Sequence, residues 1–133
     1  MNISRIKRLS RKYGEIEKIG VYIGEALLGN SYYLSILKNS GIDTSLRNLR
    51  RLKKYIDIYK AVFLKNYSGL NEDDGYIVKE VYIKGKSVCK ASVENYMSPA
   101  SIYRILKKFD LHFYYDIIKC SRIINPLLKA IEN

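Results

Sequence analysis

The side chains whose chemistry is easiest to interpret are basic and hydroxyl groups gathered between Lys84 and Phe109. Arg104 carries a planar guanidinium, which can donate two parallel hydrogen bonds to guanine O6 and N7. Lysine ammonium groups and serine hydroxyls are typical contacts for phosphates. The pattern therefore indicates a nucleic-acid contact made by Lys86, Ser87, Ser98, Ala100, Ser101, Tyr103, Arg104, Lys107 and Lys108.

The sequence lacks the groups of residues that catalysis or metal binding would require. His112 is the only histidine and Cys89 and Cys120 are the only cysteines, whereas a structural zinc site takes four clustered ligands. Residues 85–87 (Gly-Lys-Ser) resemble the end of a phosphate-binding P-loop, but position 80 is Glu80 and not the required glycine. We therefore expect no enzymatic activity, no metal and no cofactor. Both cysteines are expected to be reduced and packed, as in a cytosolic protein.

Two consecutive helices are expected to position the basic groups. Ser87 and Ser98 are good N-caps, because a serine hydroxyl accepts a hydrogen bond from an amide of the first turn. Pro99 falls at the first helical position, where its missing N–H costs no bond. A short helix, a tight turn and a second helix form the helix-turn-helix pattern over about residues 86–109. The expected core positions are Val88, Ala91, Ile102, Ile105 and Phe109.

Residues 70–109 resemble the helix-turn-helix of sigma-70 region 4, and most closely the stand-alone version in small phage activators of the ArpU/RinA type. That family often reads Leu-Pro-Glu-Glu, then an apolar helix, then Gly-Lys-Ser, then a turn in which an apolar residue precedes serine. The gap from Gly85 to Ser98 matches the gap in the family. The corresponding segments here are Leu70-Asn71-Glu72-Asp73, Ile77-Val78, Val81-Tyr82-Ile83, Gly85-Lys86-Ser87, Met97-Ser98 and Ser101-Ile102-Tyr103-Arg104.

The resemblance implies an all-α protein, a small helical bundle that binds double-stranded DNA and regulates the transcription of phage late genes. It implies a cytoplasmic location in a bacterial host cell, with a phage or a mobile element as the source. RNA polymerase and a second copy of the chain become candidate partners. The chain departs from the family pattern at Asn71, where proline is usual, at Ser92, where alanine is usual, and at Asn95, where leucine is usual.

The charge balance leaves other classes of protein open. The net charge is +11, from 24 Lys and Arg against 13 Asp and Glu, and the pI is near 9.6. Such a balance favours an anionic partner. The main alternative is an adaptor that contacts RNA polymerase or a phage assembly protein without reading bases. A protein that binds RNA or an anionic membrane surface, or a basic protein with neither partner, also fits. The sequence has no apolar run long enough to span a membrane.

The remaining sequence predicts further helices and a division into two parts. We divide the chain into a basic helical arm, 1–40, and a helical domain, 41–133. The apolar residues near the C-terminus either close the core or form a dimer seam. Gly20 and Gly24, four residues apart, would let two helices approach closely. In the first half of the chain we expect a helix over 2–19 with one basic face, a helix or a loose linker over 22–38, and a long helix over 46–67 with a second basic face. A helix over 74–83 follows. After Phe109 we expect the helix to continue or to kink, then a break at Asn125-Pro126 and a last short helix.

We expect Lys108→Ala to weaken binding to all duplex sequences alike, because a lysine on a phosphate reads no base. The plot of log affinity against log salt concentration should lose about one unit of slope. Equilibrium binding at several salt concentrations measures both effects. A loss confined to one sequence would instead place Lys108 at a base edge.

Overall fold

The computed structural model describes residues 3–132, and this part of the chain consists of helices and short connections with no strand. The predicted all-α class is therefore confirmed. The elements are α1 (Ile3–Arg11), α2 (Tyr13–Leu27), α3 (Ser31–Asn39), α4 (Leu46–Ser68), α5 (Glu72–Val78), the π-helical segment η1 (Lys79–Ile83), α6 (Val88–Asn95), α7 (Pro99–Ile117), the 3₁₀ segment η2 (Ile118–Ile123) and α8 (Ile124–Glu132).

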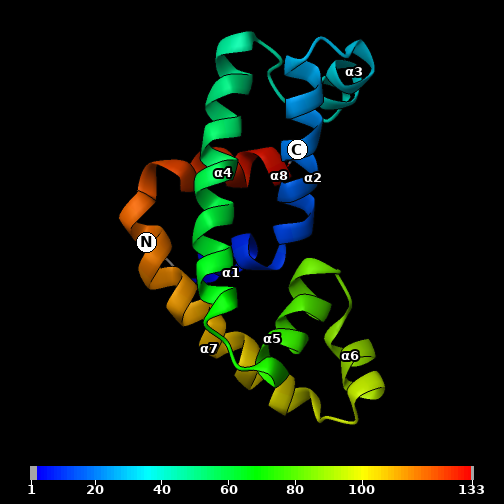
Figure 1. Cartoon of the computed structure of the whole chain (residues 1–133), viewed down its shortest axis with the longest axis vertical. Helices are drawn as coiled ribbons and strands as arrows, with labels where there is room; N and C mark the ends of the chain where they lie inside the picture. The colour runs from blue at the N-terminus through cyan, green and yellow to red at the C-terminus, as the bar shows by residue number, and fades with distance from the viewer. Residues whose placement is uncertain (1–2, 133) are drawn as a thin grey trace.

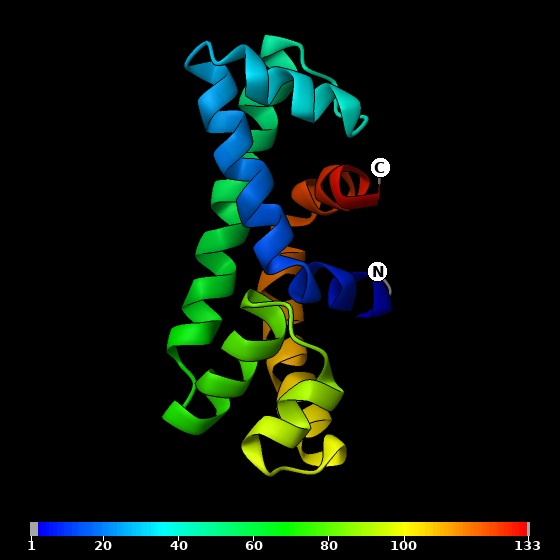
Figure 2. The same cartoon turned by 90° about the vertical axis from the view of Figure 1, so that its right-hand side faces the viewer.

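The two helices α2 and α4 run side by side in opposite directions along the long axis of the molecule (Figure 1). The short helix α3 lies at one end of this pair. At the other end lie α5, η1, α6 and the first turns of α7 (Figures 1 and 2). Between the two ends, α1 and α8 lie next to each other, and Arg8 on α1 forms an ion pair of 2.7 Å with Glu132 on α8. The elements that carry the candidate site therefore gather at one end.

Aromatic side chains from α2, α4 and α7 meet at the centre of the core. The ring centroids of Tyr13 and Phe63 lie 4.2 Å apart, those of Phe63 and Phe109 lie 5.0 Å apart, and those of Tyr59 and Phe113 lie 5.8 Å apart. Such pairs contribute about 0.5–1.5 kcal/mol each beyond the burial of their area. Side chains from both sides of the predicted boundary after residue 40 therefore share one core, while the division into arm and domain itself stays a prediction.

The C-terminal apolar residues close this core. Ile124, Leu127 and Leu128 on α8 are buried and belong to the same cluster as the aromatic rings. These residues of the segment therefore close the core. Leu111 and Ile118, which precede them, are exposed, and a dimer seam stays a prediction.

The bounds predicted for the N-terminal helices are wrong. The helix expected over 2–19 ends at Arg11, because the backbone of Lys12 leaves the helical region at φ −107° and ψ 22°. Tyr13 then begins α2, and the buried stripe continues across the break. Gly29, at φ +94°, separates α2 from α3 inside the segment expected to be one helix or a linker. Asn2, where the first prediction began, lies outside the described residues.

The C-terminal break also occurs earlier than we predicted. Cys120, at φ −116° and ψ 43°, interrupts the helical path inside η2. Asn125 and Pro126, the predicted break, lie in the first turn of α8. Proline is tolerated there, because the amide that it lacks has no partner within the helix.

The predicted helix over 74–83 forms, but its second half widens into a π-helical turn. Lys84 N–H donates to the carbonyl of Lys79 at 2.9 Å, which is a bond across five residues. This turn directs Glu80 and Tyr82 inward, and both side chains are buried. Tyr76, one helical turn earlier, is exposed.

Two glycines allow close approaches between elements. A Cβ atom added to Gly20 would lie 3.0 Å from Cγ2 of Ile56 on α4, so the close approach expected for Gly20 and Gly24 occurs at Gly20. It does not occur at Gly24, where an added Cβ would meet only the end of the Lys53 side chain. At Gly14, in the first turn of α2, an added Cβ would lie only 2.7 Å from the backbone oxygen of Ile83. Alanine therefore cannot replace Gly14 unless α2 and η1 move apart.

We expect Gly14→Ala to lower the free energy of unfolding by about 1–3 kcal/mol, because a backbone oxygen cannot rotate away from the added methyl group. Gly24→Ala is the matched control. Its added Cβ would meet no atom closer than Cε of Lys53, at 3.9 Å. The free energy of unfolding of Gly24→Ala should therefore rise by about 0.5–1 kcal/mol, because alanine favours the helix more than glycine does. Urea unfolding of both variants measures the difference, and equal stabilities would contradict the close approach.

Candidate nucleic-acid interface

The connection between α6 and α7 has the caps that the sequence predicted. Ser87 Oγ accepts a hydrogen bond of 3.0 Å from Lys90 N–H at the start of α6. Ser98 Oγ accepts a bond of 3.1 Å from Ser101 N–H at the start of α7, and the two serine hydroxyls lie 2.9 Å apart. The three serines predicted to contact DNA therefore already form hydrogen bonds within the protein; they are Ser87, Ser98 and Ser101.

Polar side chains also hold the turn between these two helices. Ser92 Oγ donates to the carbonyl of Met97, and Asn95 Nδ2 donates to the carbonyl of Ala91 at 2.8 Å. The third departure from the family pattern, Asn71, caps α5 by accepting a bond of 2.8 Å from Asp74 N–H, so all three departures form hydrogen bonds. Tyr96, which ends α6, has φ +53° and is 98% exposed. A bulky residue seldom adopts this left-handed conformation, and no burial compensates for it here.

The outward face of α7 is basic. Ile102 and Leu106 are buried, and Arg104 lies midway between them in sequence. Because each residue turns the helix by about 100°, Arg104 projects from the side opposite those two residues. Lys107 is exposed close to Arg104, as is Ala100 one turn earlier. Within residues 3–132 no carboxylate forms an ion pair with Arg104, Lys107 or Lys108.

The remaining predicted residues of α7 lie on its two flanks. Tyr103, half exposed, lines a groove between α7 and the start of α2. Lys108 lines a hollow of about 450 Å³ on the other flank, together with Asn71 and His112. The structure therefore brings Ala100, Arg104 and Lys107 together, with Tyr103 and Lys108 on either side of them. Of the expected core residues, Ile105 and Val88 are only partly buried.

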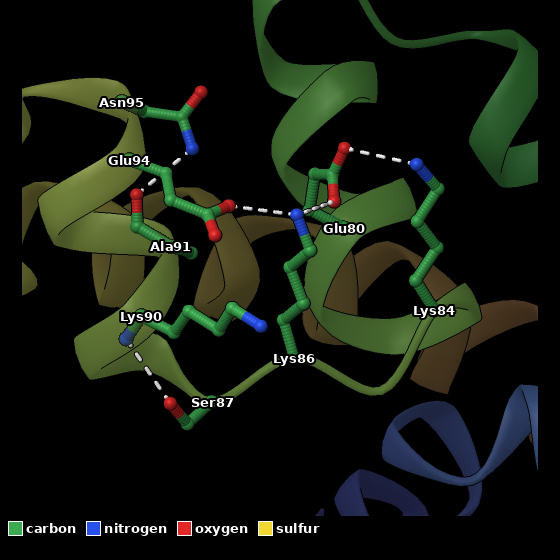
Figure 3. A network of polar contacts seen from close by, with 8 residues as sticks. All are labelled: Glu80, Lys84, Lys86, Ser87, Lys90, Ala91, Glu94 and Asn95. Carbon is green, nitrogen blue, oxygen red and sulfur yellow. Dashed lines mark hydrogen bonds and ion pairs between the residues drawn. The ribbon is translucent and has the colours of Figure 1, made fainter.

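Lys86 is held by carboxylates on two different elements. Its Nζ lies 2.8 Å from Oε2 of Glu80 on η1 and 2.7 Å from Oε2 of Glu94 on α6 (Figure 3). Lys84 Nζ approaches the other oxygen of Glu80 at 3.3 Å. The Lys86 ammonium beside it lowers the pKa of Glu80 to about 2, and the two carboxylates raise the pKa of Lys86. The network ties α6 to η1, and a phosphate contact by Lys86 stays a prediction.

A buried carboxylate that the sequence reasoning missed joins α7 to two other elements. Asp110 on α7 is 2% exposed and accepts hydrogen bonds from Ser10 Oγ on α1, at 2.7 Å, and from the hydroxyl of Tyr82 on η1, at 2.9 Å. Burial raises the pKa of both Asp110 and Tyr82. The available signal was an aspartate beside Phe109, on the side of the helix that also carries Leu106 and Phe113.

The basic face of α4 does not share a surface with the turn. Arg47, Arg50, Arg51 and Lys54 are exposed near the start of this 23-residue helix, at the end where α3 lies (Figure 1). A helix of that length measures about 35 Å. The first turns of α7 lie at the opposite end, so these α4 cations cannot join them in one compact contact.

Several other expectations can be compared with the described residues. Cys89 is exposed and Cys120 half-buried, so the expectation that both are packed is wrong for Cys89. No three His, Cys, Asp or Glu side chains within residues 3–132 cluster as a metal site would require. None of the helices described combines the length and the apolar composition needed to cross a bilayer.

Comparison of the chain with profiles of protein families, with curated proteins and with solved structures finds no match.

We expect Glu80→Gln to remove part of the acid sensitivity of the fold. The pKa of Glu80 is lowered from 4.5 to about 2, so its ionised form stabilises the folded state fully above pH 4.5 and loses this effect as the pH falls towards 2. The difference in free energy of unfolding between wild type and Glu80→Gln should therefore shrink over that window. Urea unfolding at several pH values measures it. Glu25→Gln, at a carboxylate without an ion pair among the described residues, is the control, and a constant difference would contradict the network.

Proposed function

We propose that the protein is a sequence-specific DNA-binding transcription regulator, of the kind that phages use to activate late genes, and that α7 reads the major groove from Pro99 onward. The observation that carries the proposal is the outward position of Arg104 and Lys107, without a carboxylate partner among the described residues. Cations that are neither buried nor neutralised remain available for an anionic ligand.

The shape of this end of the molecule supports entry into a groove. The turn between α6 and α7 is the outermost part of that end, well away from α3 and α8 (Figure 2). The major groove of B-DNA, about 12 Å wide, admits one α-helix. An outermost position of this kind leaves the start of α7 at a surface that a duplex can approach.

The proposal gives distinct roles to the residues of α7. Ala100, Ser101 and Arg104 face base edges, and Arg104 is the candidate for a bidentate guanine contact. Tyr103, Lys107 and Lys108 contact phosphates. The capped start of α7 at Ser98 adds backbone amides, which also bind phosphates. Lys86 acts mainly through the position of α6.

One observation favours the alternative of an adaptor protein. Val93 on α6 is 72% exposed and the neighbouring Tyr96 almost fully so, and both lie beside the proposed DNA-reading helix. Exposed apolar side chains of this kind suit a contact with another protein, and RNA polymerase is the partner that the resemblance suggests. An adaptor would need Val93 and Tyr96 but not Arg104.

We expect Arg104→Ala to lower the preference for the cognate sequence by about 1–3 kcal/mol, which corresponds to roughly 5- to 150-fold in affinity. Arg104→Lys is the sharper variant, because lysine keeps the charge but cannot form the planar pair of bonds. The Arg104→Lys variant should lose the preference for the cognate sequence, while the salt dependence of its affinity for DNA should stay the same. Competition between cognate and scrambled duplexes, with fluorescence anisotropy as the readout, measures both effects.

The control is Lys38→Ala, an exposed lysine at the end of α3, far from the turn. Its affinity and sequence preference should equal those of the wild type. An unchanged preference in Arg104→Ala would contradict the proposed groove contact. Binding of RNA polymerase that depends on Tyr96 and not on Arg104 would support the adaptor.

A further inference from the structure

A large groove runs beside α7, between the junction of α1 with α2 and the loop that joins η1 to α6. Its volume is about 800 Å³. Its lining is rich in cations and has Glu15 as its only acidic side chain. The basic lining residues are Arg11, Lys12, Lys18, Lys84 and Lys86.

The cations of the groove differ in how far they are already neutralised. Lys84 and Lys86 are paired with Glu80, and Lys12 lies 3.5 Å from Glu15. Arg11 forms no ion pair with any residue between 3 and 132. The same holds for Lys18, whose ammonium lies 5.7 Å from the ring centroid of Tyr22. The charge of Arg11 acts on the buried Asp110 and partly offsets the rise in the pKa of that carboxyl, so Arg11 is compensated in part. A hollow lined by five basic side chains and one acidic side chain attracts anions.

The groove is continuous with the surface proposed to read DNA. Tyr103 belongs to α7, immediately before Arg104, and it also lines the groove. A DNA strand bordering α7 would therefore pass Tyr103 and reach Arg11 and Lys18. In complexes of this class, contacts to the sugar–phosphate backbone fix the register of the protein on the duplex.

We propose that this groove binds the phosphates of the DNA strand that borders α7, with Arg11 and Lys18 as their ligands and Tyr103 at the mouth. The inference rests on the proposed function and extends it. It assigns the junction of α1 and α2 to the DNA interface, as a sequence-independent clamp beside the helix that reads bases. A free phosphate compound would use the same chemistry, so the test must separate these two sources.

The test measures the salt dependence of duplex binding for Lys18→Ala and for the double variant Arg11→Ala/Lys18→Ala. Each lost phosphate contact should lower the slope of log affinity against log salt by about 0.9, so the double variant should lose about two units. Affinity for cognate and scrambled duplexes should fall alike, and the preference set by Arg104 should remain.

The matched control is the double variant Lys38→Ala/Lys54→Ala, which removes two exposed lysines on α3 and α4 and should keep the wild-type slope. Thermal melting verifies that each variant is folded. If loss of Arg11 disturbs the nearby Asp110 and the double variant does not fold, Lys18→Ala alone tests the inference.

Three results would overturn the inference. If the folded groove variants keep the wild-type slope of log affinity against log salt while Arg104→Ala loses the preference for the cognate duplex, the groove does not contact DNA. The proposed function would then stand without the inference. Binding of inorganic pyrophosphate that Lys18→Ala abolishes, without any change in DNA affinity, would assign the groove to a free phosphate compound. Absence of DNA binding by the wild type would contradict the proposed function and, with it, the inference.

Discussion

One buried carboxylate joins α7 to two other elements of the fold. Asp110 receives hydrogen bonds from Ser10 of α1 and Tyr82 of η1, at 2.7 and 2.9 Å, in a place that is closed to water. A buried polar group without hydrogen-bond partners costs about 1–3 kcal/mol, so the bonds from both donors stabilise this packing. Because the three groups belong to three elements, the bonds act together with the buried apolar stripe of α7 to hold one face of that helix inward. Arg104 then projects outward, and Tyr103 lines the groove beside the junction of α1 and α2.

Two further contacts extend this arrangement to the whole end of the molecule. The close approach of Gly14 to the Ile83 carbonyl brings the start of α2 against η1. The ion pairs of Lys86 with Glu80 and Glu94 then join η1 to α6 (Figure 3). The junction of α1 and α2, the π turn, and the pair α6–α7 are thus held together by backbone proximity, buried hydrogen bonds and ion pairs. A groove lined with cations between these elements is a direct consequence of that packing.

Much of this end could be predicted from sequence, because its signals are local. The caps Ser87 and Ser98 and the proline at the start of α7 set helix bounds within a few residues, and the long apolar repeat predicts α4. The break at Lys12 and the kink at Cys120 have no glycine or proline at those positions, so no local signal marks them. The role of Asp110 and the pairing of Lys86 depend on residues distant in sequence, or on a π turn that periodicity does not reveal. The basic face of α4 is also evident from the sequence, whereas its place at the end of the molecule opposite the first turns of α7 follows only from the three-dimensional packing.

The central claim is that α7 reads DNA sequence. The measurement that tests it most directly is selection of fragments from random genomic duplex DNA by the whole chain, with affinities taken at about 50 and 200 mM salt. Six to ten phosphate contacts predict a fall in affinity of about 10³- to 10⁵-fold between those concentrations. We predict that fall together with enrichment of one sequence motif. A steep fall without an enriched motif, or no binding at the lower salt concentration, would contradict the account.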